Sequence, residues 1–353
     1  MRLDPRKSVL AAAALAAAAV AVGALACGGS EPRREATATG DPAARSLTPA
    51  DTAAWYQACW GHFNSREWDA FRACYADTVE SEQVDSGHPR ARGLEAAMAV
   101  NRGFAEAFPD LKGTGELILV NGANLVSVYV LIGTNTGPML GPDGQSTPAT
   151  NKPIGVYQAH HLQTDASGAK VVKEEFYVDS GTMLAQLGLS ELPARPVVTS
   201  AAAKPTVVVA SGTPAELSNV ELTRAQIAAY NSHDAKGVDA FAAPDFVYCD
   251  LTMPADQTAK ESSASTVEFF KAFPDAKLVP LSIWGAGNYV VVIGRFEGTN
   301  KGPMPAMGLK KASNKTVSAR YLDIVRWENG KAKEEWLFYD GPAFARQVGL
   351  ITK

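Results

Sequence analysis

The spacing of apolar residues along the chain changes from helical to alternating, and this change occurs twice. Helical spacing begins after Thr48, where apolar residues recur at Trp55, Cys59 and Phe63 and would share one face of a helix. Thr48 is followed by Pro, Ala and an acid, and so is Thr213. A Thr N-cap, a Pro at the first helical position and an acid in the first turn are typical of a helix start. We therefore expect a helix to begin after each of these threonines.

Apolar runs of strand length follow the helices in both stretches. A short second helix and a third helix are expected first, and Pro109 and Pro274 would stop the third helix at Phe108 and Phe273. The runs that predict strands are 117–120, 125–133, 153–163, 171–178, 316–327 and 332–339. A last helix is expected near Asp179 and Asp340. Helices followed by a meander of strands indicate an α+β layer.

The two stretches are copies of each other at an offset of 165 residues. Between residues 107–139 and 272–304, 14 of 33 positions are identical without a gap. The identical blocks include Phe-Pro-Asp, Gly-Thr-Asn and Gly-Pro-Met. A period of this length is too long for a solenoid repeat, so it indicates a duplicated domain.

The composition between the copies sets the domain boundaries. We assign domain 1 to residues 48–190 and domain 2 to residues 213–353. Residues 191–212 are rich in Pro, Ala and Ser and form a linker, in which Val207-Val208-Val209 could be a short strand. Residues 27–47 lack apolar periodicity and are expected to be a flexible tether.

Residues 1–26 have the composition of an export signal. Three basic residues precede a stretch over 8–25 that is almost entirely Ala, Val and Leu. The following Ala24-Leu25-Ala26-Cys27 resembles the bacterial lipobox, and this resemblance implies that Cys27 becomes the acylated first residue. We expect an exported protein that is anchored by its lipid to the bacterial envelope, at the outer membrane. An uncleaved anchor or a plain secretion signal are the alternatives.

Charge and cysteine content exclude several classes of function. The net charge of −4 and the absence of a basic run argue against nucleic acid as a partner. Neither a CxxC pair nor a Cys/His cluster occurs, so we expect no metal site. Export would permit disulfides, and Cys59 and Cys74 lie on neighbouring predicted helices where they could meet, which would leave Cys249 unpaired.

The ordered motifs of the two copies resemble the SnoaL-like polyketide/ester cyclase family of the nuclear-transport-factor-2-like superfamily. They cover nearly all of each copy, and domain 2 matches better than domain 1. The motifs are Phe-Pro-Asp, Gly-Thr-Asn-x-Gly-Pro-Met, the segment 321–331, Glu334-Glu335-Trp336, Asp340 and Gln347-Val348-Gly349-Leu350.

This resemblance implies two tandem cone-shaped domains. In each, helices pack on a curved, mostly antiparallel sheet that encloses a largely apolar pocket. Family members that are cyclases close a ring by an intramolecular aldol condensation without a cofactor. We therefore expect no cofactor and a small apolar molecule as partner. Single-domain relatives commonly dimerise through their sheets, so the two domains could form an intramolecular pseudo-dimer.

Three residues are candidates for acid/base catalysis. Asp323 lies within an apolar and aromatic strand, where desolvation would raise the pKa of its carboxyl group if it faces a cavity. It could instead point outward and pair with Arg320 or Arg326. Domain 1 has Ala159 near this position, and His161 could replace the aspartate there. One glutamate of each pair, Glu334-Glu335 and Glu174-Glu175, must point inward if the strand alternates, and Glu335 is the candidate.

The ligand-binding candidates are aromatic and methionine side chains, which could equally be core residues. They are Tyr321, Trp336, Trp284, Tyr157, Met304 and Met139. Asp340 precedes Gly-Pro and a helix, so we interpret it as an N-cap.

Two functions are compatible with these observations. Active cyclases often have an acid after the strand tryptophan, whereas this chain has Leu337 and, in domain 1, Tyr177. That departure and the export signal favour an exported, lipid-anchored protein that binds a small apolar molecule. The alternative is a cofactor-independent acid/base cyclase or a related lyase or isomerase.

Overall fold

The computed structural model describes residues 46–192 and 194–351 of the chain. The predicted signal, Cys27 and most of the tether lie outside these residues. Within the described part, no helix is both long and apolar enough to cross a membrane. These residues belong to one compact unit.

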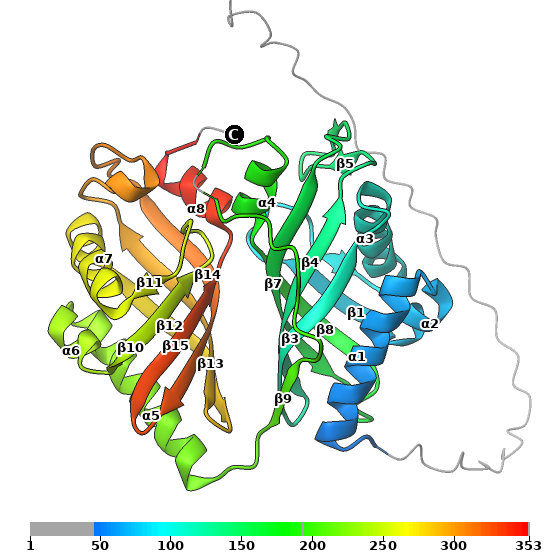
Figure 1. The fold of residues 1–353 in the computed structure, drawn as a ribbon, viewed down its shortest axis with the longest axis horizontal. Helices are drawn as coiled ribbons and strands as arrows, with labels where there is room; N and C mark the ends of the chain where they lie inside the picture. The colour runs from blue at the N-terminus through cyan, green and yellow to red at the C-terminus, as the bar shows by residue number, and fades with distance from the viewer. Residues whose placement is uncertain (1–45, 193, 352–353) are drawn as a thin grey trace, which may run out of the picture. The chain divides into compact units, whose positions relative to one another are not determined.

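Domain 1 has four helices and eight strands (Figure 1). The helices are α1 (Pro49–Ser65), α2 (Trp68–Ala73), α3 (Leu94–Ala107) and α4 (Ser180–Gln186). The strands are β1 (Tyr75–Gln83), β2 (Ala91–Arg92), β3 (Lys112–Asn121), β4 (Asn124–Thr134), β5 (Met139–Leu140), β6 (Ser146–Thr147), β7 (Pro153–Thr164) and β8 (Val171–Val178).

Domain 2 follows the linker strand β9 (Thr206–Val209) and repeats this order, except that a short 3-10 helix replaces β5 and β6. Its helices are α5 (Pro214–Asn231), α6 (Ala235–Asp239), α7 (Ala259–Ala272), the short 3-10 helix η1 (Pro305–Met307) and α8 (Gly341–Val348). Its strands are β10 (Ala242–Asp250), β11 (Gln257–Thr258), β12 (Lys277–Ala286), β13 (Tyr289–Thr299), β14 (Thr316–Glu328) and β15 (Lys331–Phe338).

Each domain has one main sheet with the same strand order. The order is β2-β1-β8-β7-β4-β3-β9 in domain 1 and β11-β10-β15-β14-β13-β12 in domain 2. The long helices cover one face of each sheet (Figure 1). The predicted α+β class with two tandem domains is therefore confirmed. The linker strand predicted at Val207–Val209 is also present, and it pairs in parallel with β3.

The strands β1 and β10 were not expected from the sequence. They follow the second helix of each domain and pair in parallel with the last strand, β8 or β15. Parallel pairing joins segments that are far apart in the sequence, and the apolar residues of β1 are spaced irregularly because its register with β8 shifts between Tyr75 and Glu80. Each strand is nine residues long, but polar residues interrupt its apolar pattern, so the sequence gives no clear strand signal.

The first helix of each domain begins as predicted. The hydroxyl oxygens of Thr48 and Thr213 accept hydrogen bonds from the backbone amides of Asp51 and Glu216, and each acid reaches back to its threonine amide. Asp340 is the N-cap of α8, since its carboxylate accepts from the amide of Ala343 at 2.6 Å. These caps satisfy amides that a helix leaves unpaired at its first turn.

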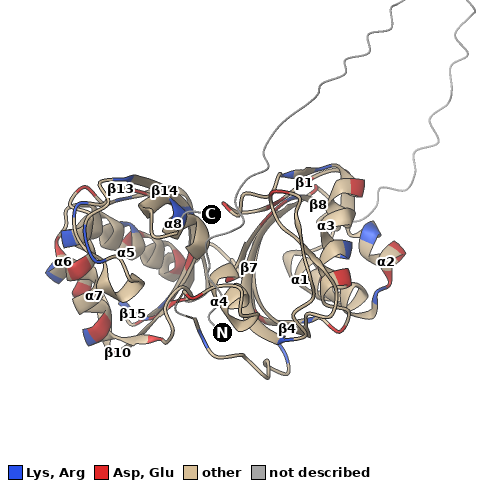
Figure 2. Cartoon of the chain, turned by 90° about the horizontal axis from the view of Figure 1, so that it is seen from above, with Lys and Arg blue, Asp and Glu red and all other residues tan. Residues whose placement is uncertain are grey.

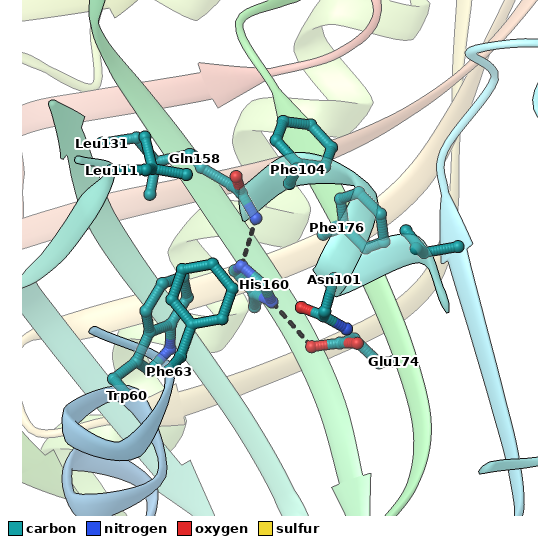
Figure 3. Close-up of a pocket in the computed structure, with 11 residues that line it drawn as sticks. Trp60, Phe63, Asn101, Phe104, Leu111, Leu131, Gln158, His160, Glu174 and Phe176 are labelled. Carbon is teal, nitrogen blue, oxygen red and sulfur yellow. Dashed lines mark hydrogen bonds and ion pairs between the residues drawn. The ribbon is translucent and has the colours of Figure 1, made fainter. Parts of the chain in front are cut away.

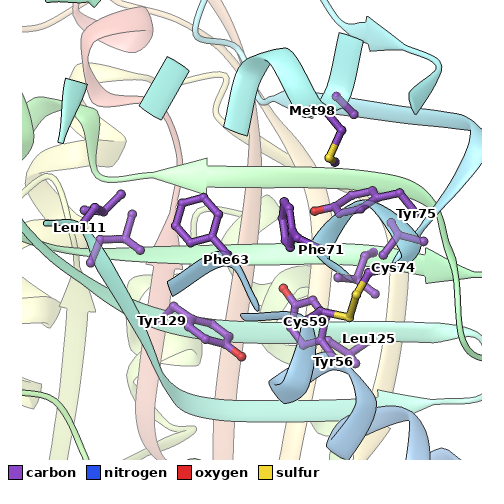
Figure 4. Close-up of a cluster of buried hydrophobic side chains, with 14 of the residues drawn as sticks. Tyr56, Cys59, Phe63, Phe71, Cys74, Tyr75, Met98, Leu111, Leu125 and Tyr129 are labelled. Carbon is purple, nitrogen blue, oxygen red and sulfur yellow. A yellow bond between two sulfur atoms is a disulfide. The ribbon is translucent and has the colours of Figure 1, made fainter. Parts of the chain in front are cut away.

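The core of domain 1 is filled by aromatic side chains and a disulfide (Figure 4). Cys59 on α1 is bonded to Cys74 at the end of α2, so the two predicted helices do meet. Tyr56, Phe63 and Tyr129 belong to the same core and are almost fully buried. Cys249 is free and buried.

The two main sheets share a buried apolar cluster on the faces that the helices leave uncovered. Val126, Val128 and Tyr177 of domain 1 belong to it together with Val291 and Ile324 of domain 2. In Figure 2 many of the charged segments lie on the outer helices α2, α3, α6 and α7 instead. The strand faces that point away from the helices are thus apolar, in line with the alternation of side chains along a strand.

Charged contacts surround this shared cluster. Arg320 of β14 donates from Nε to the carboxylate of Asp85 at 3.0 Å and also pairs with Glu82. The hydroxyl of Ser180 donates to Asp340 at 2.8 Å. Domain 1 and domain 2 are therefore joined by side chains as well as by the linker.

Candidate functional site

The strand registers identify which residues of the two domains occupy the same position. Ser127 pairs with His160 across β4 and β7, and Val292 pairs with Asp323 across β13 and β14. Ser127 and Val292 are separated by the repeat offset of 165. The residue that corresponds to Asp323 is therefore His160, and not Ala159 as the sequence comparison suggested.

A glutamate follows on the next strand in both domains. Glu174 pairs with Leu162, two residues after His160, and Glu335 pairs with Val325, two residues after Asp323. Residues placed diagonally on neighbouring strands share one face of the sheet. Each interior therefore holds a pair of titratable side chains, which is His160 and Glu174 in domain 1 and Asp323 and Glu335 in domain 2.

The pair of domain 2 consists of two acids on the face that α5 and α7 cover. The amide nitrogen of Gln226 on α5 donates to Oε2 of Glu335 at 3.0 Å. Oδ1 of Asp323 and the hydroxyl of Tyr321, two residues earlier on the same face, are buried without a hydrogen-bond partner. Both atoms can therefore still form hydrogen bonds within this interior.

Burial raises the pKa of both acids. For Asp323, desolvation and the neighbouring charge of Glu335 raise the pKa well above its ordinary value, and the backbone amide of Ile324 opposes this. For Glu335, desolvation raises the pKa to about 7, and the hydrogen bond from Gln226 opposes the rise. No described cation forms an ion pair with either acid. Burial therefore favours the protonated form of both carboxyl groups.

The surroundings of this acid pair are aromatic and only partly filled. Asp323 and Glu335 are half-buried, and so are Tyr230, Tyr248 and Phe269, which pack around the same interior. Half-buried side chains on the inner face of a sheet mean that solvent reaches the interior. The inner side chains of domain 2 are therefore partly accessible, and they combine aromatic rings with two carboxyl groups.

The pair of domain 1 is a histidine held by a fixed glutamate (Figure 3). Nδ1 of His160 lies 3.0 Å from Oε1 of Glu174, and the hydroxyl of Ser81 donates to Oε2 of Glu174 at 2.9 Å. Gln158 contacts the other ring nitrogen of His160. Both members of the pair are nearly inaccessible, at 5% and 4% exposure.

Little space remains around this histidine. The cavity beside it has a volume of about 40 Å³, which is room for a few water molecules. The Trp60 ring fills the rest, since it stacks on Tyr129 at 4.3 Å between centroids and meets His160 edge-on. The titratable pair of domain 1 is therefore more deeply buried than that of domain 2.

Several predicted site residues lie on the opposite faces of the sheets. His161 points away from the helices and pairs with Glu175, with Nδ1 3.0 Å from Oε2, and Glu175 approaches Arg320 of domain 2. Trp336, Trp284 and Tyr157 belong to or pack on the shared cluster between the sheets. Side chains alternate along a strand, so neighbours of interior residues cannot reach the interior.

The two methionines lie at different places. Met304 is buried in the core of domain 2, and Met139 packs at the margin of the domain 1 core. Of the predicted site residues, the structure thus brings together Asp323, Glu335 and Tyr321. His160, Glu174 and Gln226 were not chosen from the sequence, although the glutamate pair at Glu174-Glu175 did signal that one acid points inward.

Within residues 46–192 and 194–351, there is no group of three or more His, Cys, Asp or Glu side chains that could hold a metal ion. The acid pair of domain 2 consists of two carboxyl groups whose pKa values are raised by burial, and such groups can act in proton transfer.

The comparison with protein families agrees with this architecture. A model described as SnoaL-like polyketide cyclase matches residues 50–187 and 220–348. The chain belongs to this family. Both domains are matched, and the two matches together cover well over half of the chain.

Solved structures of similar fold each align with about two fifths of the chain. AclR from Streptomyces galilaeus is 20% identical, with 38% of this chain and 98% of that chain covered and a TM-score of 0.35. TsrD from Streptomyces laurentii is 24% identical, with 38% of this chain and 97% of that chain covered and a TM-score of 0.34. An NTF2-like protein of unknown function from Burkholderia pseudomallei is 18% identical, with 37% of this chain and 98% of that chain covered and a TM-score of 0.32. No curated protein matches the chain.

Proposed function

We propose that domain 2 binds a small, mainly apolar carbonyl compound in its interior and moves a proton on it. The observation that carries this proposal is the pair Asp323 and Glu335 on one face of the sheet, half-buried among aromatic side chains and without a counter-ion among the described residues. An aromatic interior suits an apolar ligand, and the acids are the groups there that can exchange protons near neutral pH.

The proposal gives different roles to the two acids. Glu335, in its ionised form, would accept a proton from a carbon next to the carbonyl group, and an enolate would form. Asp323, in its protonated form, and the unpartnered hydroxyl of Tyr321 would donate hydrogen bonds to the enolate oxygen. If the enolate carbon attacks a second carbonyl of the same molecule, a ring closes and the new alkoxide takes a proton from Asp323.

Domain 1 would support this site without sharing its chemistry. Its titratable pair is buried, and Trp60 occupies the space that a ligand would need. We also propose that the protein is exported and held at the bacterial envelope by a lipid on Cys27, which the lipobox-like segment supports. Acyl chains on Cys27 would hold the site close to the membrane.

The experiment is solvent exchange measured by NMR. The full chain is incubated in D₂O with 2-tetralone, an apolar ketone with acidic C–H bonds, and incorporation of deuterium next to the carbonyl is followed. We expect exchange above the buffer rate, lowered about 100-fold by Asp323→Asn or Glu335→Gln. Glu297→Gln, which removes an acid paired with Arg295 on β13, is the matched control and should leave the rate unchanged.

The alternative is a receptor that binds without catalysis, which the presence of Leu337 after the strand tryptophan favours. Saturation-transfer NMR with the same ketone separates the two. Binding that persists in all three variants while exchange stays at the buffer rate would overturn the acid/base proposal and support the receptor.

A further inference from the structure

A second cavity lies away from both interiors, where the edge of the domain 1 sheet faces β13, β14 and β15. Its volume is about 190 Å³. Glu116 and Leu117 of β3 form one side, and Tyr289, Arg326, Glu334 and Trp336 contribute to the other. None of these six side chains belongs to the acid pair of domain 2, and those on β14 and β15 alternate with it along their strands. This cavity therefore requires an explanation of its own.

The walls of this cavity are aromatic and apolar. Trp336 and Tyr289 are half-buried, so their rings are partly accessible from the cavity. The ring of Tyr157 lies next to Trp336 at 6.2 Å between centroids and extends the aromatic surface. Leu117 is buried and closes one side. Such a surface favours a ligand with an apolar body, and aromatic rings also attract cations.

The positive charge in the cavity is already neutralised. Arg326 donates from Nε to Glu334 at 2.8 Å, and its guanidinium lies 4.0 Å from the carboxylate of Glu328. An anionic ligand would have to displace these carboxylates. Arg326 therefore does not make the cavity a site for anions.

The negative charge of Glu116 is not neutralised. Glu116 accepts a hydrogen bond from the amide of Ala202 at 2.8 Å, which fixes its carboxylate, and it forms no ion pair with any described residue. It is half-buried, and the pKa of Tyr157 is raised by burial first and then by the charge of Glu116. A fixed carboxylate beside aromatic rings is the arrangement that binds an organic cation.

We infer that the cavity binds a small organic amine. Its ammonium group lies against Glu116, and its apolar part lies on Trp336 and Tyr289. A neutral apolar molecule of the same shape would desolvate Glu116 without compensation, so it binds more weakly. This inference is independent of the proposed function, because the two sites use different faces of the domain 2 sheet.

The test is isothermal titration calorimetry of the full chain with three probes of similar shape. Phenethylamine is a cation at pH 7, 2-phenylethanol is neutral and phenylacetate is an anion. We expect the amine to bind about tenfold more tightly than the alcohol, and phenylacetate to show no binding. Equal affinities for the amine and the alcohol would overturn the inference without any variant.

Variants locate the site. Glu116→Gln keeps the shape and removes the charge, so phenethylamine should bind about tenfold more weakly, while Glu106→Gln on the exposed surface of α3 should have no effect. Asp323→Asn should leave amine binding unchanged even if it abolishes ketone exchange. Unchanged binding in Glu116→Gln, or loss of binding in Asp323→Asn, would overturn the inference, the latter because the amine would then occupy the domain 2 interior.

Discussion

The two domains have the same strand order but different interiors. At the same pair of sheet positions, domain 1 has a histidine held by a glutamate, and domain 2 has two acids. Domain 1 is filled by Trp60 and fastened by a disulfide, whereas the inner side chains of domain 2 remain partly accessible. The difference shows that the common sheet places a titratable pair at the same positions in both domains, and that the side chains packed against the pair determine how deeply it is buried.

Replacing the tryptophan that closes domain 1 is the strongest test of this difference. Trp60→Ala should lower the free energy of unfolding by about 3 kcal/mol, because a large side chain stacked on Tyr129 is removed and a cavity remains. Urea denaturation measures this loss. The variant should also bind apolar probes beside His160. If it binds none, Trp60 is not the side chain that excludes ligands from the interior of domain 1.

The disulfide gives the second test. The bond links residues 15 apart, so its loss in Cys59→Ala/Cys74→Ala should lower the stability of domain 1 by about 3 kcal/mol. Calorimetry with and without a reducing agent would show this loss as a lower melting temperature for one of two unfolding transitions. Cys249→Ala, which removes the free cysteine, is the control. A shift that moves both domains equally would mean that they unfold as one unit.

The acid pair of domain 2 predicts a pH dependence with a defined sign. Since the pKa of Glu335 is raised to about 7 in the folded state, its ionisation opposes folding. Stability is full below the ordinary glutamate pKa and is lost as pH rises through 7, by roughly 3 kcal/mol in total. Denaturation midpoints of wild type and Glu335→Gln between pH 4.5 and 8 measure it. If Glu335→Gln shows the same dependence of stability on pH as the wild type, Glu335 is not the group that causes it.

The smallest effects should be equal in the two domains. Thr48→Ala and Thr213→Ala each remove the same capping box, so each should cost about 1 kcal/mol. Thermal melts of the two variants compare them directly. Markedly unequal losses would show that the contacts around the first helices differ more than their common start indicates.

The sequence predicts the local features of this fold well. Caps at Thr48 and Thr213, the N-cap at Asp340 and the contact between Cys59 and Cys74 depend on residues close in the chain. The structure confirms the three caps, and it shows that Cys59 and Cys74, for which the sequence left pairing open, form a disulfide.

The direction in which a strand residue points is harder to predict from the sequence. His160 and His161 are adjacent, and so are Glu174 and Glu175, yet one member of each pair faces the helices and the other faces the second domain. A shift of one residue exchanges the two faces, and the register between β7 and β8 does shift between Gln163 and Thr164. Both faces of these strands are largely buried, so hydrophobicity does not distinguish them.

The linker strand β9 has a consequence for how the chain can be divided. It lies beside β3 and completes the edge of the domain 1 sheet, although it comes after that domain in the sequence. A fragment that ends at residue 190 would leave the outer edge of β3 unpaired, although β3 would still pair with β4, and an open edge of this kind recruits other strands. Domain 1 made without the linker should therefore self-associate, whereas domain 2 carries Pro280 and a bulge on its own edge strand β12, which discourage such pairing.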